Sequence, residues 1–406
     1  MIHFWQLPDN RNYIILEKKF KSKIFKNVKQ VCKDRNLLRR FNRKEKVSIK
    51  TIKEISKITK IYLSFFEKNI LWIGGCNSKG ISKPRLPFNF ASREGSRFIA
   101  AIINDGCITQ EGDENYGRLM YDNFDETIRK SVLNDYVKVF GGSFKEVAFR
   151  NYERKKFLEF SSVVRDITSK IIVEKGWKCE SNLKIPAFVL RNKDNMCGWV
   201  EQTIADEGEV KYYPSKYRRS IIWRRSLDVT SIFIHPIKMD IPLKRMSVKM
   251  QNNIQKKLCN LIESEKDILN RLGIKYRIYN LGVYSTVKNK IRTRWQISIT
   301  GRENLIKLRK LIKIPSKEKN IKFYYICTEF KRYKEPIKIR QNIINLGIYK
   351  KRFTSVDLQK KMNYKNVGNT YKWLNKFVKE KLLKKIKNST YGNGHYRKPA
   401  EYILIK

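Results

Sequence analysis

The sequence predicts an α+β fold in which one order of elements, αββαββα, occurs twice between two smaller basic modules. A short apolar helix that ends in a carboxylate followed by glycine occurs at Asp105–Gly106 and again at Glu207–Gly208. After each of these helices, the spacing of apolar residues indicates the same series of strands and helices. We therefore expect two repeats, at residues 89–186 and 187–330.

The segments that follow the two helix ends match one by one. The first repeat continues with strand-like residues 107–121, a helix at 126–140, strands at 144–150 and 156–160, and a helix at 163–173. The second continues with strand-like residues 209–225, a helix at 251–272, strands at 275–287 and 292–300, and a helix at 302–312. A longer insertion separates residues 227 and 247. Each repeat is long enough for helices packed on one sheet.

A basic module precedes the repeats at residues 1–88. Lys and Arg are dense there and alternate with aromatic residues, and Ile49, Ile52, Ile55 and Ile58 recur at helical spacing. The sequence predicts a mostly helical module that ends in a linker at 74–87, where glycine and proline accumulate. Two short helices around a turn are consistent with a helix-turn-helix or with a helical hairpin that packs on the next domain.

A second basic module follows at residues 338–406. Its pattern predicts helices at 355–362 and 367–383, then a basic hairpin and a final apolar strand at 402–405. This order is typical of a winged helix, in which the second helix enters the major groove of DNA. The alternative is a packing module whose charges are merely solvated.

Composition indicates a polyanionic partner. The 406 residues include 89 Lys and Arg against 38 Asp and Glu, a formal net charge of +51, and 41% are hydrophobic, which excludes wholesale disorder. Nucleic acid is the natural partner for such a charge, although an AT-rich genome could explain part of the lysine content. The seven Cys are scattered and there are only three His, which argues against a zinc knuckle, a disulfide scaffold and a Ser-His-Asp catalytic site. We expect an intracellular protein of the cytoplasm, nucleoid or organelle matrix that is not secreted.

The paired helix ends carry the chemistry. Glycine after a helix permits a left-handed cap, but a carboxylate at the negative end of the helix dipole is unfavourable unless a cation faces it. Two such helices side by side would bring Asp105 and Glu207 together, and two carboxylates can hold Mg²⁺ or Mn²⁺ with water completing the shell. The candidate metal site is therefore Asp105 and Glu207, with the adjoining Gly106 and Gly208. An ordinary helix cap is the alternative for either motif alone.

Residues 98–106 (FIAAIINDG) and 200–208 (VEQTIADEG) resemble the two motifs of a single-chain LAGLIDADG homing endonuclease. The resemblance extends over roughly residues 90–325. It implies two pseudo-symmetric αββαββα repeats packed through the motif helices, metal bound at Asp105 and Glu207, and cleavage of both DNA strands with short 3′ overhangs. Gln202 departs from the small residue that the family motif has at its third position, and Ile103 and Ala205 replace an often acidic one.

Basic residues complete the candidate site. The resemblance implies a lysine near the scissile phosphate, for which Lys317, Lys319 and Lys184 are candidates. Alternating strand positions would contact the DNA groove. Candidate DNA-binding residues are Lys211, Tyr213, Lys216, Arg218, Arg224, Arg225, Lys275, Arg277, Tyr279, Lys288, Lys290 and Arg292 in the second repeat, the sparser Arg118 and Arg150 in the first, and Lys372 and Lys376 near the C-terminus.

Together these features predict a monomeric, Mg²⁺-dependent, sequence-specific endonuclease acting on double-stranded DNA. The sequence begins Met1-Ile2 and has no His-Asn pair near its end, so we expect a free-standing gene product rather than a protein-splicing element. Two alternatives stay open. One is a catalytically inactive DNA-binding regulator on the same scaffold, and the other is an intron maturase that binds RNA.

Overall fold

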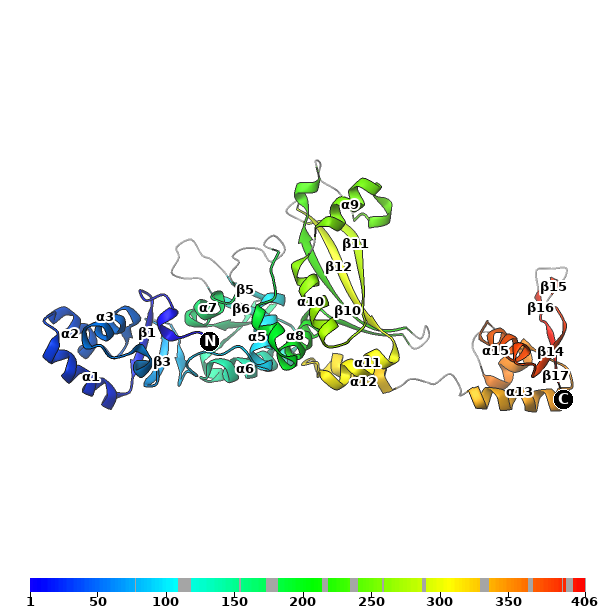
Figure 1. The fold of residues 1–406 in the computed structure, drawn as a ribbon, viewed down its shortest axis with the longest axis horizontal. Coiled ribbons are helices and arrows are strands. Elements are labelled where there is room, and N and C mark those ends of the chain that lie inside the picture. The colour runs from blue at the N-terminus through cyan, green and yellow to red at the C-terminus, as the bar shows by residue number, and fades with distance from the viewer. Residues whose placement is uncertain are drawn as a thin grey trace. The chain divides into compact units, whose positions relative to one another are not determined.

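The structure is a computed structural model. It describes residues 1–76, 78–108, 118–152, 155–172, 182–213, 218–233, 240–257, 259–286, 290–328, 336–363, 368–388, 390–391 and 397–405. The chain forms two compact units, Met1–Thr328 and Glu329–Lys406 (Figure 1). In the described ranges, no helix combines the length and the apolar character that a membrane span needs.

A small antiparallel sheet and four helices form the N-terminal part of the first unit. The sheet has the order β2-β1-β3-β4, with β1 (Asn12–Leu16), β2 (Val47–Ser48), β3 (Ile70–Gly75) and β4 (Ile81–Ser82). The helices are α1 (Lys18–Val31), α2 (Arg35–Arg43), α3 (Ile49–Thr59) and α4 (Leu63–Glu67). Ile49, Ile52 and Ile55 are fully buried, as their spacing predicts, whereas Ile58 is 40% exposed.

The glycines that suggested a linker at residues 74–87 belong instead to this sheet. A Cβ atom on Gly74 would lie 2.6 Å from the ring of Trp72, and one on Gly80 would lie 2.3 Å from it. The glycines therefore allow the chain to pack against an indole ring, and Ile81 of β4 is buried. The prediction of a linker is wrong because glycine here marks a close contact rather than a flexible connection.

The rest of the first unit contains two sheets with their helices. The first group has α5 (Arg93–Asn104), β5 (Gly106–Ile108), β6 (Leu119–Asp122), α6 (Glu126–Phe140), β7 (Ala148–Tyr152), β8 (Lys155–Phe160) and α7 (Ser162–Ser169). The second has α8 (Lys193–Asp206), β9 (Glu209–Tyr213), β10 (Arg218–Asp228), α10 (Asn260–Arg271), β11 (Arg277–Ser285), β12 (Ile291–Thr300) and α11 (Arg302–Leu311). The antiparallel sheets have the orders β5-β6-β8-β7 and β9-β10-β12-β11. The chain is thus a mixed α and β fold with antiparallel sheets, and the pseudo-symmetry of the two groups stays a prediction.

Helices α5 and α8 pack side by side between the two sheets (Figure 1). Phe98, Ala100 and Ala101 of α5 are fully buried. The helices come very close at Gly198, where a Cβ atom would lie 2.3 Å from the carbonyl oxygen of Arg93. Glycine at this position lets the two backbones touch, so the helices run together toward their C-termini.

The helix predicted at 251–272 is interrupted. Instead of one helix, α9 (Val248–Lys256) and α10 occur, because the two parts bury their apolar sides in different places. Ile254 of α9 packs with Val229, Val283 and Ile291 in a small separate core near the ends of the long strands, whereas Ile268 of α10 belongs to the main core. A further helix, α12 (Lys317–Thr328), closes the first unit.

The second unit has a core of its own around Ile343, Leu374 and Tyr402. Its helices are α13 (Pro336–Lys350), α14 (Ser355–Met362) and α15 (Gly368–Lys379). Its strands are β13 (Phe353–Thr354), β14 (Leu383–Lys387), β15 (Thr390–Tyr391), β16 (Arg397–Lys398) and β17 (Glu401–Leu404), of which three pair in the order β13-β17-β14. The predicted helix at 367–383 ends earlier, since Lys381 has φ of 56°. The winged-helix assignment stays a prediction.

Candidate active site at the ends of α5 and α8

The predicted carboxylates cap the two central helices at the same end. The N–H of Asp105 donates to Ala101 O, and the N–H of Glu207 donates to Thr203 O, both at 3.0 Å. Neither Gly106 nor Gly208 has a positive φ, so the expected left-handed cap is wrong. A Cβ atom would instead lie 2.6 Å from Ile102 Cα or 2.5 Å from Ile204 O. Glycine is required because the chain folds back directly over its own helix.

A third carboxylate, which the sequence analysis did not single out, lies between the two motifs. Asp206 accepts hydrogen bonds from Tyr121 Oη at 2.7 Å and from Gln202 Nε2 at 2.9 Å, and Asn104 Nδ2 lies 3.3 Å away. The amide nitrogen of Asn123 lies 3.0 Å from Asp105 Oδ2 and 3.4 Å from Asp206 Oδ1. One side chain therefore contacts carboxylates from both motifs, which places Asp105 and Asp206 close together.

The negative charges in this cluster repel one another, and they raise the pKa values of its buried members. Burial raises the pKa of Asp206 well above its usual range, and the charge of Asp105 raises it further, despite the hydrogen bonds that favour the ionised form. Burial also raises the pKa of Tyr121, and the neighbouring Asp206 adds to that effect. Tyr121 therefore remains a hydrogen-bond donor throughout the physiological pH range.

Of the three candidate lysines, the structure brings only Lys319 to the helix ends. Its Nζ donates to Ala205 O at 2.5 Å and to Ile204 O at 3.3 Å, so it neutralises the C-terminus of α8. Burial lowers the pKa of Lys319, and Asp206, Asp105, Asp125 and Glu207 are close enough to oppose this. Lys317 and Lys184 are exposed, and Lys317 contributes only its backbone N–H to Thr127 Oγ1.

Arg225, expected to contact DNA, is buried instead, with 5% of its surface exposed. Its Nη2 lies 2.5 Å from Glu265 Oε1, its Nη1 donates to Asn104 Oδ1 at 2.8 Å, and Nη1 lies 3.7 Å from Glu207 Oε1. Burial would lower the pKa of Arg225, but Glu265 and Glu207 together raise it. Arg225 thus contacts Asn104 and Glu207 from the protein interior. The prediction that it contacts DNA is wrong.

Gln202, which stands where the family motif has a small residue, takes part in the hydrogen bonds of this cluster. It is fully buried between the motif helices, where its Nε2 donates to Asp206 and lies 3.3 Å from Tyr121 Oη. The larger side chain is accommodated because it replaces a direct contact between the helices by a hydrogen bond to Tyr121 of β6. Its Oε1 is buried with no partner among the described residues.

Several predicted groove residues share one exposed face of the second sheet. Arg224 pairs across the sheet with Gln296, and Gln296 pairs with Tyr279, so the three lie in one row. Arg224 Nε donates to Gln296 Oε1 at 3.1 Å. Arg294, which sequence analysis missed, stacks over Tyr284 at 4.2 Å. The alternation of β12 residues could have identified Arg294 and Gln296, since both lie an even number of residues from Arg292.

The other predicted DNA ligands are distributed as follows. Lys211, Lys275, Arg277, Lys290 and Arg292 are exposed or half-buried on the second sheet and its loops. Arg118 and Arg150 of the first sheet both pair with Glu159, at 3.3 and 2.6 Å. Lys372 and Lys376 are exposed on α15 in the second unit. Lys216 and Lys288 lie outside the described residues, as do the side chains of Tyr213 and Arg218.

At the helix ends, the side chains that could bind a metal ion offer only oxygen atoms, and they are few. Among the described residues, no group of three or more His, Cys, Asp or Glu side chains has an arrangement that could hold a metal ion. Mg²⁺ is bound in proteins through one or two carboxylates and keeps several waters. Asp105 and Glu207 each supply a carboxylate of this kind, and the repulsion between Asp105 and Asp206 provides a demand for positive charge at these helix ends.

No protein-family model matches the chain, and no curated protein sequence matches it. Solved structures that are similar to parts of it include two proteins of related architecture. The N-terminal LAGLIDADG domain of DUF199/WhiA is 9% identical with a TM-score of 0.28, covering 56% of this chain and 86% of that domain. The homing endonuclease I-WcaI bound to its DNA recognition sequence is 15% identical with a TM-score of 0.30, covering 57% of this chain and 87% of that protein. At these TM-scores, the interpretation of the site depends on the contacts described above.

Proposed function

We propose that this chain is a monomeric, Mg²⁺-dependent endonuclease of the LAGLIDADG homing type that cleaves double-stranded DNA. The observation that supports the proposal is the packing of α5 against α8, because Asp105 and Glu207 follow the C-termini of these two helices and both act on the charge of Lys319. These two carboxylates come from distant parts of the chain. A purely structural role does not require acidic groups at the negative ends of two neighbouring helices.

Asp105 and Glu207 are the residues that would hold the metal. When bound there, Mg²⁺ would polarise a phosphodiester oxygen and lower the pKa of a bound water. The chain's own residues orient this pair, because Asn123 Nδ2 donates to Asp105 and Arg225 lies 3.7 Å from Glu207. Lys319 adds a positive charge at the same helix ends, where it favours the approach of a phosphate.

The exposed row on the second sheet provides a surface for duplex DNA. Arg224, Gln296 and Tyr279 project from three neighbouring strands on the face opposite Arg225, because successive residues of a strand alternate between faces. Arginine can pair with guanine O6 and N7 or grip phosphate. The first sheet offers less positive charge, since Arg118 and Arg150 share the carboxylate of Glu159. We therefore propose that the two half-sites are bound with unequal strength.

The test is cleavage of a plasmid library with randomised inserts in Mg²⁺. Asp105→Asn and Glu207→Gln should each abolish cleavage while keeping DNA binding, because only a carboxylate charge is removed. Asp194→Asn is the matched control, since Asp194 lies at the opposite end of α8 and is 79% exposed. Cleavage that is unchanged in both site variants, or lost equally in the control, contradicts the proposal.

A second candidate is a DNA-binding protein without nuclease activity. The ion pair between Glu207 and Arg225 favours it, because a cation of the protein already offsets one of the two carboxylates. In that case the parent chain would bind duplex DNA tightly and leave it intact with Mg²⁺ or Mn²⁺. The plasmid assay separates the two functions directly.

A further inference from the structure

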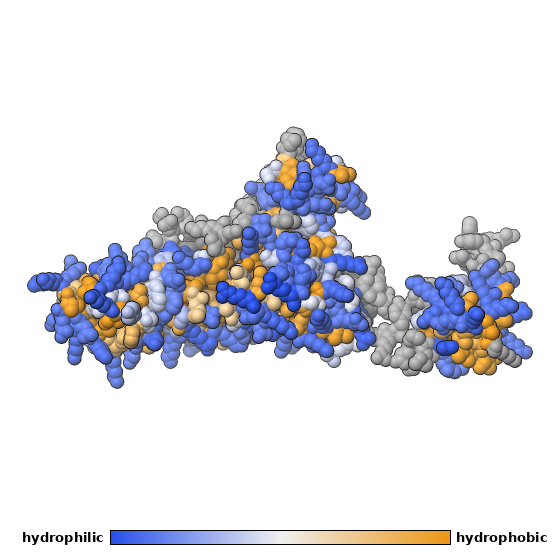
Figure 2. Space-filling view, in the orientation of Figure 1, coloured by the Kyte–Doolittle hydropathy of each residue, from blue (hydrophilic) through white to orange (hydrophobic). Residues whose placement is uncertain are grey.

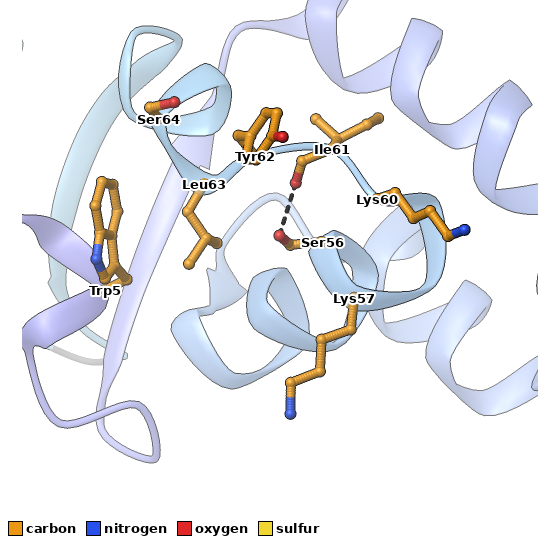
Figure 3. Close-up of a pocket in the computed structure, with 8 residues that line it drawn as sticks. All are labelled: Trp5, Ser56, Lys57, Lys60, Ile61, Tyr62, Leu63 and Ser64. Carbon is orange, nitrogen blue, oxygen red and sulfur yellow. Dashed lines mark hydrogen bonds between the residues drawn. The ribbon is translucent and has the colours of Figure 1, made fainter.

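A cavity of about 560 Å³ opens in the N-terminal part of the first unit, between η1 (Phe4–Gln6), the end of α3 and the start of α4 (Figure 3). Trp5 and Leu63 line one end of it, and Lys57 and Lys60 line the other, with Tyr62 at the rim. Its volume falls within the range of ligand pockets, roughly 300–1,000 Å³. Figure 2 shows apolar side chains emerging among hydrophilic ones in this part of the molecule.

Contacts within the protein hold the indole ring of Trp5 in place. Trp5 stacks on His3 with ring centroids 4.3 Å apart, and Phe4 meets it edge-on at 5.2 Å. His3 is fixed in turn by Glu67, whose Oε2 lies 2.9 Å from His3 Nδ1. Tyr62, by contrast, is 75% exposed. An oriented indole beside a solvent-facing phenol ring offers flat surfaces on which another ring can stack.

The charge around the cavity selects an anionic occupant. Lys57 and Lys60 are exposed, and neither forms an ion pair with any described residue. The acidic groups nearby are engaged elsewhere, as Glu54 pairs with Arg40 at 3.2 Å and Glu67 with His3. Residues 1–88 carry 22 Lys and Arg against 6 Asp and Glu. A ligand here therefore combines an apolar ring with negative charge.

We propose that this cavity binds an unpaired nucleotide of a DNA strand. The base would stack on the exposed ring of Tyr62 at the rim, next to the apolar end formed by Trp5 and Leu63, and the flanking phosphates would lie against Lys57 and Lys60. A base inside a duplex is stacked on both faces and exposes only its edges, so the site requires a single-stranded segment. This inference goes beyond the proposed nuclease function and uses none of its residues.

The experiment measures binding of the full chain to a fluorescent oligo(dT) of about 12 nucleotides by anisotropy, with EDTA present to prevent cleavage. Tyr62→Ala should weaken binding of the single strand about tenfold, the effect of removing one stacking ring, with little change for a duplex of equal length. Tyr62→Phe keeps the ring and should bind as the parent does. Tyr349→Ala, at a position 87% exposed in the second unit, is the matched control.

Each other outcome overturns the inference. It fails if Tyr62→Ala binds the single strand as well as the parent, if Tyr349→Ala weakens binding equally, or if Tyr62→Ala weakens duplex binding to the same extent. It also fails if an oligo(rU) of the same length binds about tenfold more tightly than the DNA strand, since the occupant would then be RNA. Thermal melting confirms that Tyr62→Ala is folded. Because the assay contains no metal, its result is separate from the outcome of the cleavage assay.

Discussion

The guanidinium of Arg225 lies 2.5 Å from Glu265 Oε1, and both side chains are almost completely buried. Glu265 also accepts a hydrogen bond from Trp223 Nε1 at 2.7 Å. This pair joins β10 to α10 directly behind the candidate active site. A buried ion pair of this kind costs desolvation to form, but it is far more costly to break by removing one partner.

Removing the Arg225 side chain should therefore destabilise the first unit strongly. Arg225→Ala leaves Glu265 charged and buried, and we expect the free energy of unfolding to fall by about 3–5 kcal/mol. Combining Arg225→Met with Glu265→Gln should recover most of this loss, because no charge is then buried and an oxygen remains for Trp223. Urea denaturation followed by tryptophan fluorescence measures both values. A loss below about 1 kcal/mol for the single variant would contradict this role.

A methyl group at Gly208 should disturb the site through the backbone. Gly208→Ala places a Cβ atom 2.5 Å from Ile204 O, so the turn that carries Glu207 must move. We expect a loss of stability of about 1–3 kcal/mol together with loss of cleavage. Gly106→Ala should act in the same way on Asp105. If both variants keep parental stability in urea and parental cleavage, the close packing of these turns is not required.

Thiol reactivity should separate the cysteines by burial. Cys327 is 7% exposed, and burial raises its pKa to about 11, so it remains a protonated thiol at pH 8. Iodoacetamide should modify the exposed Cys107 first, and Cys327 only after unfolding in urea. Peptide mass spectrometry over a time course measures both rates. Equal rates for the two thiols in the folded protein would be inconsistent with this packing.

On the proposed function, DNA binding should depend steeply on salt, because a chain with a net charge of +51 would neutralise many phosphates. Arg224→Gln should reduce the slope of log affinity against log salt by about 1, as expected for one lost phosphate contact. Arg150→Gln is the matched comparison, and it should change the slope less because Arg150 already pairs with Glu159 at 2.6 Å. Titrations of a duplex at several salt concentrations test this. Identical slopes for both variants would refute the assignment of the exposed face.

The residues of the site were accessible from the sequence to different degrees. Asp105 and Glu207 could be found because a carboxylate before glycine at a helix end is a local pattern that occurs twice. Asp206 could not be found, because its role depends on hydrogen bonds from Tyr121 and Asn123, which lie more than 80 residues earlier in the chain and meet it only after folding. Lys319 could not be told from its neighbour Lys317 in the sequence, and only the structure, in which α12 brings the Nζ of Lys319 to Ala205 O, separates them.

Arg224 and Arg225 illustrate the limit of pattern reading in strands. Two consecutive residues must face opposite sides of a sheet, so at most one of them could contact DNA from the exposed face. The alternation in β10 favours Arg225 as the inner residue, because Ile221, Trp223 and Leu227 share its side of the strand, whereas Ser220, Ser226 and Asp228 share the side of Arg224. It does not show the partner that balances the buried charge, because Glu265 lies on a helix 40 residues further along the chain.

The close approach of Gly198 to the backbone at Arg93 has a consequence for assembly. The seam between α5 and α8 is formed only when both halves of the first unit have folded, and each half contributes one acidic helix tip. A partly folded intermediate therefore holds at most one of the two tips. On the proposed function, such an intermediate would lack one of the two carboxylates and would not cleave DNA until both halves have folded.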